Sequence, residues 1–368
     1  MSADSSAWTP PHCPNPQCDT HQKSLGWRFK KAGFFRRERA PHRVQRYRCS
    51  RCDRNFSSQT FSTTYWLKRP DCLEPVFLAE VNGSGHRQIA RQLSISHATV
   101  QRHVERLGRH CLLVHESLRS RARARIATED CVLDGLGAFA GGQYWPFELT
   151  TVIGARSYYS HDFTVTEKRR AGRHRPDQKA RRARYEARLG RPDPRGLKRD
   201  VLELIEASLP ERVPIVLRSD EKKEYGWALA RLPAHRITRE TTHSKKPRTP
   251  RNRLFPINAH HGFLRHSGAN HKRETIAFSK RLQAAIYRHA IFQAWRNLVK
   301  AASERRPYQT PAQRLGVTQR RWTAAEVLGR RRFVTRMRLR PRVAAYYGGE
   351  VRSRFCARER EHALRYAF

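Results

Sequence analysis

Three acidic residues stand where their carboxylates could hold divalent metal ions. Asp134 interrupts the apolar run 131–136, where a carboxylate is costly to bury without a cation. Asp220 follows the apolar run 213–217, at or just beyond the end of a predicted strand, and Glu274 opens a predicted helical segment. Mg²⁺ and Mn²⁺ prefer carboxylate oxygens, and two such ions about 4 Å apart can drive in-line phosphoryl transfer. We therefore expect these three acids to converge on a divalent-metal site.

A basic residue accompanies the third acid. Arg281 lies seven residues after Glu274, which on a helix returns it to within about 20° of the same face. It could therefore hold a phosphate group near the metal ions. Glu274 also has a simpler interpretation, as a first-turn glutamate that the helix dipole stabilises. Other acids compete for the three positions: Glu221 and Glu224 for Asp220, Asp162 for Asp134, and Glu240 for Glu274.

Four cysteines form two short pairs near the start of the chain, Cys13 with Cys18 and Cys49 with Cys52. Two such pairs separated by a β-rich span are typical of a zinc ribbon, in which four thiolates hold a structural Zn²⁺. The first pair is two residues wider than the second, so His12 or His21 could replace a cysteine as a ligand. The other cysteines are expected to be buried or incidental: Cys72, Cys111, Cys131 and Cys356.

Residues 87–103 have the pattern of a helix-turn-helix. Apolar positions fall on the inner faces of two short helices, and Ser96 is placed to cap the second of them. In this motif the second helix enters the major groove of DNA. A plain helical hairpin is the alternative. The candidate DNA contacts are Ser96, His97, Thr99, Gln101, Arg102 and His103.

The charge balance favours a polyanionic partner. The chain has 75 Lys and Arg against 32 Asp and Glu, a net charge of +43, which favours fast and salt-dependent binding to double-stranded DNA. Within it, residues 168–199 carry fourteen basic residues against three acids. No apolar run of about 18 residues is present, so membrane binding is not expected. The first residues have no secretory signal, which predicts a cytoplasmic, nucleoid-associated protein.

The distribution of motifs predicts an α/β protein with several units. We expect the catalytic domain to be a mixed α/β unit, because short β-like runs alternate with amphipathic segments such as 199–209 and 272–300. The 168–199 insertion is expected to be a solvated, partly helical or disordered segment, with a DNA-tracking arm as the alternative. The predicted units are a zinc ribbon (8–66), a helical helix-turn-helix domain (70–127), a catalytic domain (128–302) with the basic insertion, and a basic C-terminal tail (303–368).

In their order, these motifs resemble the DDE-type insertion-sequence transposases that join a zinc ribbon and a helix-turn-helix to a ribonuclease H-like catalytic domain. The resemblance implies a DNA transposase that binds the ends of an insertion element, cleaves them and transfers the strands, as a homo-oligomer on DNA. It also implies that Asp134, Asp220 and Glu274 are the metal-binding triad and that Arg281 is the basic residue two turns later. The motifs that carry it are 47–52 with 56–57, 87–103, 133–135, 218–220, 273–274, and 310–317 with Trp322.

Two other functions are compatible with the same motifs. A non-catalytic regulator, such as a decayed transposase, would keep the zinc ribbon and the helix-turn-helix and bind DNA without metal-dependent cleavage. A nuclease that hydrolyses DNA without strand transfer shares the first chemical step, so only a strand-joining assay distinguishes it.

Overall fold

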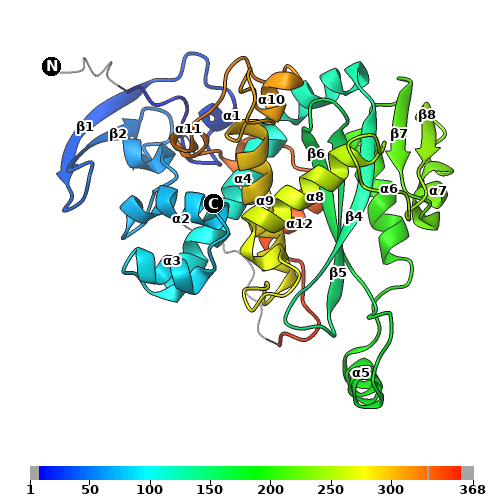
Figure 1. Cartoon of the computed structure of the whole chain (residues 1–368). Helices are drawn as coiled ribbons and strands as arrows, with labels where there is room; N and C mark the ends of the chain where they lie inside the picture. The colour runs from blue at the N-terminus through cyan, green and yellow to red at the C-terminus, as the bar shows by residue number, and fades with distance from the viewer. Residues whose placement is uncertain (1–7, 330, 358–368) are drawn as a thin grey trace.

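Two sheets organise residues 8–329 and 331–357, which are the residues that this computed structural model describes (Figure 1). A three-stranded antiparallel sheet has the order β1-β2-β3, and a five-stranded mixed sheet has the order β6-β5-β4-β7-β8. The expected α/β class is therefore confirmed. The strands are β1 (Phe29–Arg36), β2 (Arg43–Cys49), β3 (Asn55–Ser57), β4 (Cys131–Phe139), β5 (Pro146–Gly154), β6 (Ser160–Glu167), β7 (Ile215–Ser219) and β8 (Ile237–Thr241).

Helices surround the mixed sheet and build the region between the two sheets (Figure 1). The α-helices are α1 (Asp19–Gln22), α2 (Leu73–Glu80), α3 (His86–Gln92), α4 (His97–Arg125), α5 (Pro176–Leu189), α6 (Gly196–Ser208), α7 (Lys223–Leu229), α8 (Phe255–Ser267), α9 (Leu282–Leu298), α10 (Pro311–Arg314), α11 (Ala324–Leu328) and α12 (Pro341–Gly348). Short 3-10 turns are η1 (Ser58–Phe61), η2 (Pro70–Cys72), η3 (Ile126–Thr128), η4 (Ala269–His271) and η5 (Val334–Arg336).

The centre of the mixed sheet is apolar because helices cover both of its faces. β4 pairs with β5 in antiparallel and with β7 in parallel register. Successive residues of a strand point to opposite faces. Val132 accordingly packs with Ile257 of α8, whereas Leu133 packs with α6 and α7 through Leu204 and Tyr225. The side chain of Asp134 therefore belongs to the face that α8 covers.

The helix-turn-helix is built into the main core rather than attached to it by a linker. Its second helix, α4, continues for 29 residues and packs along α9. The two helices approach closely because Gly108 has no side chain; a Cβ there would lie within 3.0 Å of Tyr287. One apolar cluster consequently runs from Val76 of α2 to Leu298 of α9. The predicted boundary after residue 127 falls in η3, where α4 ends.

Parts of the predicted C-terminal tail pack against the rest of the chain, although its first residues, 303–309, are exposed. Phe333 lies against the ring of Phe61 in the N-terminal module, with ring centroids 5.3 Å apart. The hydroxyl of Tyr346 accepts a hydrogen bond from the backbone N–H of Val165 in β6 (3.1 Å). This segment therefore links the N-terminal module to the mixed sheet. Residue 330 and residues 358–368 of the predicted tail lie outside the described residues.

Candidate functional site

Asp134 and Asp220 come together at the centre of the mixed sheet. β4 and β7 are neighbouring parallel strands in which Leu133 is paired with Ser219; Asp134 follows Leu133 in β4, and Asp220 comes directly after the end of β7. Burial raises the pKa of Asp134 to about 6, and the negative charge of Asp220 contributes to that shift. The backbone N–H of Gly135 donates to the Asp134 carboxylate (2.7 Å). Two carboxylates whose charges interact in this way favour a cation between them.

A third carboxylate, which the sequence analysis did not select, lies beside this pair. Glu148 is a buried residue of β5, and its carboxylate covers Gly135, where a Cβ would lie within 3.0 Å of it. The ammonium groups of Lys168 and Lys222 donate to its two oxygens, each at 2.7 Å. Burial alone would raise the pKa of Glu148, but the charges and hydrogen bonds of Lys222 and Lys168 together outweigh burial, and the pKa is lowered.

The backbone around Asp220 is braced from β8. The guanidinium of Arg239 donates to the carbonyl oxygens of Asp220 (2.6 Å) and Lys222 (3.1 Å), and to the hydroxyl of Ser219 (2.9 Å). The Asp220 carboxylate also accepts from the N–H of Lys222 (3.1 Å). These contacts fix the turn after β7, so Asp220 is presented at a defined position next to Asp134.

Helix α8 supplies the polar groups that face Asp134. The Nδ1 atom of His261 lies 3.7 Å from a carboxylate oxygen of Asp134, too far for a direct hydrogen bond. Burial, with the charges of Arg265 and Arg248, lowers the pKa of His261 to about 3, so the imidazole is neutral at pH 7. Asn258, one turn earlier, shares this side of the helix, and Arg265 follows one turn later. The imidazole of His261 and the amide oxygen of Asn258 can bind a metal ion, and the guanidinium of Arg265 can bind a phosphate.

The predicted helix around Glu274 is wrong. After η4 the backbone is irregular, and α9 begins only at Leu282. Glu274 is exposed in this irregular segment, and Arg281 has extended dihedral angles (φ −143°, ψ 154°) just before α9. The hydroxyl of Thr275 bonds the carbonyl of Ala269 and accepts the N–H of Ala277, a local turn that competes with helix formation. Glu274 and Arg281 therefore do not share a helix face.

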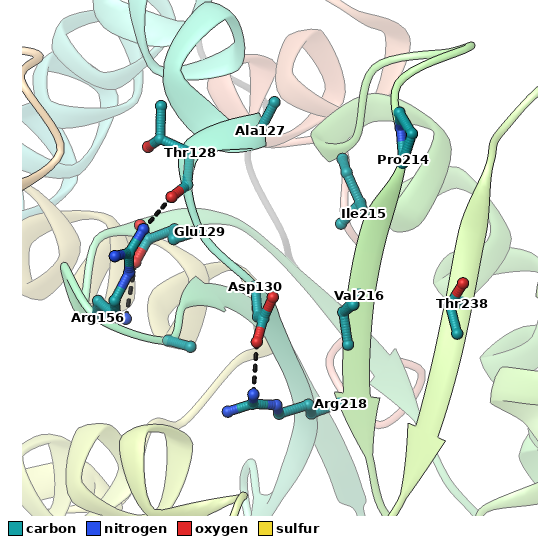
Figure 2. A pocket seen from close by; sticks show the side chains of 11 residues that line it. Ala127, Thr128, Glu129, Asp130, Arg156, Pro214, Ile215, Val216, Arg218 and Thr238 are labelled. Carbon is teal, nitrogen blue, oxygen red and sulfur yellow. Dashed lines mark hydrogen bonds and ion pairs between the residues drawn. The ribbon is translucent and has the colours of Figure 1, made fainter.

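The competing acids are engaged elsewhere. Glu240 forms ion pairs with Arg218 (3.4 Å) and with Arg253 (2.7 Å), close to the start of α8. Arg218 also reaches Asp130 on the wall of a pocket of about 510 Å³ (Figure 2). That pocket lies by the amino-terminal ends of β4 and β7, whereas Asp220 follows the carboxyl end of β7.

Of the three remaining competing acids, Asp162 and Glu221 have basic or histidine partners, and Glu224 lies four residues after Asp220. Asp162 is buried in β6, where Arg340 and Arg342 pair with it. Glu221 is exposed, 3.7 Å from His243. Glu224 is a half-buried residue in the first turn of α7.

The helix-turn-helix presents only some of the predicted DNA contacts. The hydroxyl of Ser96 caps α4 by accepting the N–H of Thr99 (3.1 Å), and Ser96, His97 and Arg102 are exposed. Gln101 is half-buried and donates to Glu105 (2.9 Å). The expectation for His103 is wrong, because this residue is 2% exposed. It follows Val100 by three positions and so shares the inner face of the helix.

The four N-terminal cysteines form a group that could hold a metal ion. Their sulfur atoms all lie within 4.8 Å of one another, and those of Cys13 and Cys52 are 3.6 Å apart. A tetrahedral Zn²⁺ with Zn–S bonds of about 2.3 Å separates its sulfurs by about 3.8 Å, so the spacing fits. Burial would raise the pKa of Cys49, but the indole N–H of Trp27 and backbone N–H groups lower it to about 6, which favours the thiolate.

Neither histidine is required to complete this group. His21 donates from Nδ1 to the carbonyl of Cys13 (2.8 Å), and its Nε2 pairs with the hydroxyl of Thr335 (2.8 Å). His12 also bonds the Cys13 carbonyl (2.9 Å). The histidines therefore support the backbone beside the cysteines and join it to η5. Within residues 8–329 and 331–357, the cysteines are the one group of histidine, cysteine or acidic residues close enough to hold an ion by themselves.

Comparisons of the chain with protein-family models and with curated proteins found no match. In the described part of the chain, no helix combines the length and apolar character that crossing a membrane requires.

Proposed function

We propose that the protein is a DDE-type DNA transposase with a ribonuclease H-like catalytic domain. The observation that carries the proposal is the position of Asp134 and Asp220, each directly after a residue of the paired positions Leu133 and Ser219 of two neighbouring parallel strands. Burial, with a contribution from the charge of Asp220, raises the pKa of Asp134 to about 6. A mixed sheet covered by helices on both faces is compatible with this domain. The two aspartates would hold Mg²⁺ or Mn²⁺, which supply the activation of a water or 3′-hydroxyl and the stabilisation of the leaving oxygen.

The third ligand is proposed to come from α8 instead of Glu274. The Nδ1 atom of His261 on that helix lies 3.7 Å from a carboxylate oxygen of Asp134. Asn258 offers an amide oxygen from the same side of the helix. Arg265 stands seven residues after Asn258, the spacing that the sequence analysis assigned to Glu274 and Arg281. Arg265 would then hold the phosphate, because a guanidinium binds phosphate oxygens through paired hydrogen bonds.

Recognition of the element ends is assigned to α4, and folding of the N-terminal module to zinc. The exposed groups at the start of α4 are Ser96, His97 and Arg102, with Thr99 half-buried beside them. This end of α4 is the part of such a helix that contacts base edges. Four cysteines with closed coordination imply a structural Zn²⁺ without an open position for catalysis.

The decisive experiment measures cleavage and strand transfer on a plasmid that carries the DNA flanking the gene. Asp134→Asn and Asp220→Asn should abolish Mg²⁺-dependent cleavage and joining while leaving DNA binding intact, because each change removes a metal ligand and preserves the side-chain shape. Glu221→Gln is the matched control, an exposed acid next to Asp220 that should retain activity. A wild-type protein that binds this DNA and never cleaves it would instead be a non-catalytic regulator.

The third ligand is tested in the same assay. His261→Gln and Asn258→Ala should each lower cleavage, whereas Glu274→Gln should retain it. Loss of activity in Glu274→Gln, with both α8 variants active, would show that the assignment to α8 is wrong while the reaction class stands.

A further inference from the structure

Helix α5 stands apart from both sheets (Figure 1), and none of its residues is buried. Its position is nevertheless set by one face. Tyr185 packs against Tyr144 and Trp145 of the turn between β4 and β5, with ring centroids 5.5 and 5.3 Å apart. Glu186, on the same side, pairs with Arg169 before the helix and Arg191 after it. The helix is therefore attached along an inner face.

A basic ridge runs along α5 beside this inner face. Arg181, Arg184 and Arg188 recur at intervals of three and four residues, so they line one side of the helix. All three are exposed, and the guanidinium group of Arg181 also lies over the ring of Tyr144, 6.0 Å from its centroid. No ion pair with a described acid is found for these three arginines, because Glu186 is taken by other arginines and Asp177 by Arg175.

The base of this arm is joined to the carboxylate cluster. Lys168, at the end of β6 where the arm begins, donates to Glu148 at 2.7 Å. Glu148 in turn covers Gly135, the neighbour of Asp134. A DNA duplex whose phosphate reacts at Asp134 and Asp220 would thus pass the base of the arm.

We propose that Arg181, Arg184 and Arg188 bind the phosphate backbone of a DNA duplex next to the catalytic carboxylates. This is a contact apart from the helix-turn-helix, and its location relative to the reacting phosphate rests on the proposed function. Charge decides the occupant: a second copy of this chain carries a net charge of +43 and would repel the ridge, whereas duplex DNA offers a continuous row of phosphates. Guanidinium groups match phosphate geometry.

The test compares two triple variants in binding to a random-sequence duplex over a range of salt concentrations. The arm variant is Arg181→Gln, Arg184→Gln and Arg188→Gln. The control removes three exposed charges elsewhere, by Lys23→Gln, Arg305→Gln and Arg321→Gln. Each lost phosphate contact reduces the slope of log K against log salt by about 0.9. The arm variant should therefore lose about 2 to 3 from this slope, and the control variant less than about 1.

Several outcomes would overturn the proposal. An unchanged salt slope in the arm variant would mean that α5 is a solvated helix that does not contact DNA. An equal loss of slope in both variants would mean that DNA binds through the overall positive charge of the protein and not through α5. Dissociation of an oligomer by the arm variant in sedimentation without DNA, with the slope unchanged, would identify a second copy as the partner. Because no residue of α5 is buried, both variants should unfold at the wild-type temperature. An unchanged unfolding temperature would exclude misfolding as the cause of altered binding.

Failure of this inference is distinguishable from failure of the proposed function. If wild-type protein cleaves the plasmid and the arm variant keeps its salt slope, only the arm assignment fails. If the slope falls as expected and wild-type protein never cleaves, the arm stands as part of a non-catalytic DNA-binding protein.

Discussion

At the residue scale, the carboxylate cluster depends on a glycine. Gly135 and Gly137 both lie in β4, but a Cβ at Gly135 would come within 3.0 Å of the Glu148 carboxylate, whereas a Cβ at Gly137 would have no atom within 4 Å. Gly135→Ala should therefore displace Glu148 from Lys222 and destabilise the protein by about 1–3 kcal/mol. Urea unfolding measures this cost. The matched control, Gly137→Ala, should change stability little, and an equal effect of both variants would contradict the proposed contact.

Single residues also show what the sequence could and could not predict. A carboxylate inside an apolar strand is a strong signal, and it led to Asp134, which lies where expected in β4. Glu148 interrupts the apolar run of β5 in the same way, but it was missed because its partner lysines are 20 and 74 positions away. Glu274 was selected from a helical pattern that Thr275 interrupts by a local turn. Spacing alone does not reveal such side-chain competition with the backbone.

At the scale of elements, the N-terminal module is expected to depend on its metal. Its apolar core consists mainly of aromatic side chains packed beside the cysteines, too little to fold without a metal or a disulfide. Cys49→Ser should lower bound Zn²⁺ from about one per chain toward zero and increase hydrogen exchange in residues 8–66. Cys356→Ser, outside the module, serves as the control with unchanged zinc content. A zinc-free Cys49→Ser protein with wild-type exchange would contradict the assignment.

On the proposed function, neighbouring residues of α4 divide between DNA recognition and packing. Arg102 is exposed and His103 is buried, so neighbouring substitutions should have different effects. Arg102→Ala should weaken binding to the element ends by about 1–3 kcal/mol, more than it weakens binding to random DNA. His103→Ala should instead lower the unfolding temperature, because it opens a cavity in the core. Competition binding and thermal unfolding measure the two effects.

A different result would change which residues of α4 are assigned to contact DNA bases. Equal weakening by Arg102→Ala on element ends and on random DNA would make Arg102 a phosphate contact. The helical periodicity of the buried positions could have distinguished His103 from Arg102, since residues 100, 103, 104 and 107 all lie on the buried side of α4.

At the scale of the whole molecule, the predicted units are joined more closely than their sequence suggests. The long helix α4 belongs to the helix-turn-helix at one end and packs on α9 at the other. Glu80 of α2 is buried with Arg288 of α9, their charged atoms 2.8 Å apart. Such contacts link residues more than 200 positions apart, so no local pattern predicts them. The α/β class and the cysteine group could be predicted from the sequence, but the shared core could not.

Histidines buried in this shared core predict how the fold responds to acid. Burial lowers the pKa of His110 to about 4, and that of His161 and His271 to about 3. In the unfolded chain these rings titrate near pH 6.5. Between pH 6.5 and about 4 the unfolded state therefore binds more protons than the folded state, so stability is fully present above pH 6.5 and is lost as the pH falls. Each such histidine contributes a slope of about 1.4 kcal/mol per pH unit in that window.

His110 allows this prediction to be tested on one group. Its Nε2 bonds the carbonyl of Val327 at 2.7 Å and joins α4 to α11. His110→Gln keeps a hydrogen-bond donor but does not titrate, so urea unfolding between pH 7.5 and 4.5 should show a slope smaller by about one proton. His97→Gln, at the exposed start of α4, should leave the slope unchanged. A wild-type slope in His110→Gln would contradict the assignment to His110 and leave the acid response to other buried histidines, such as His161 and His271.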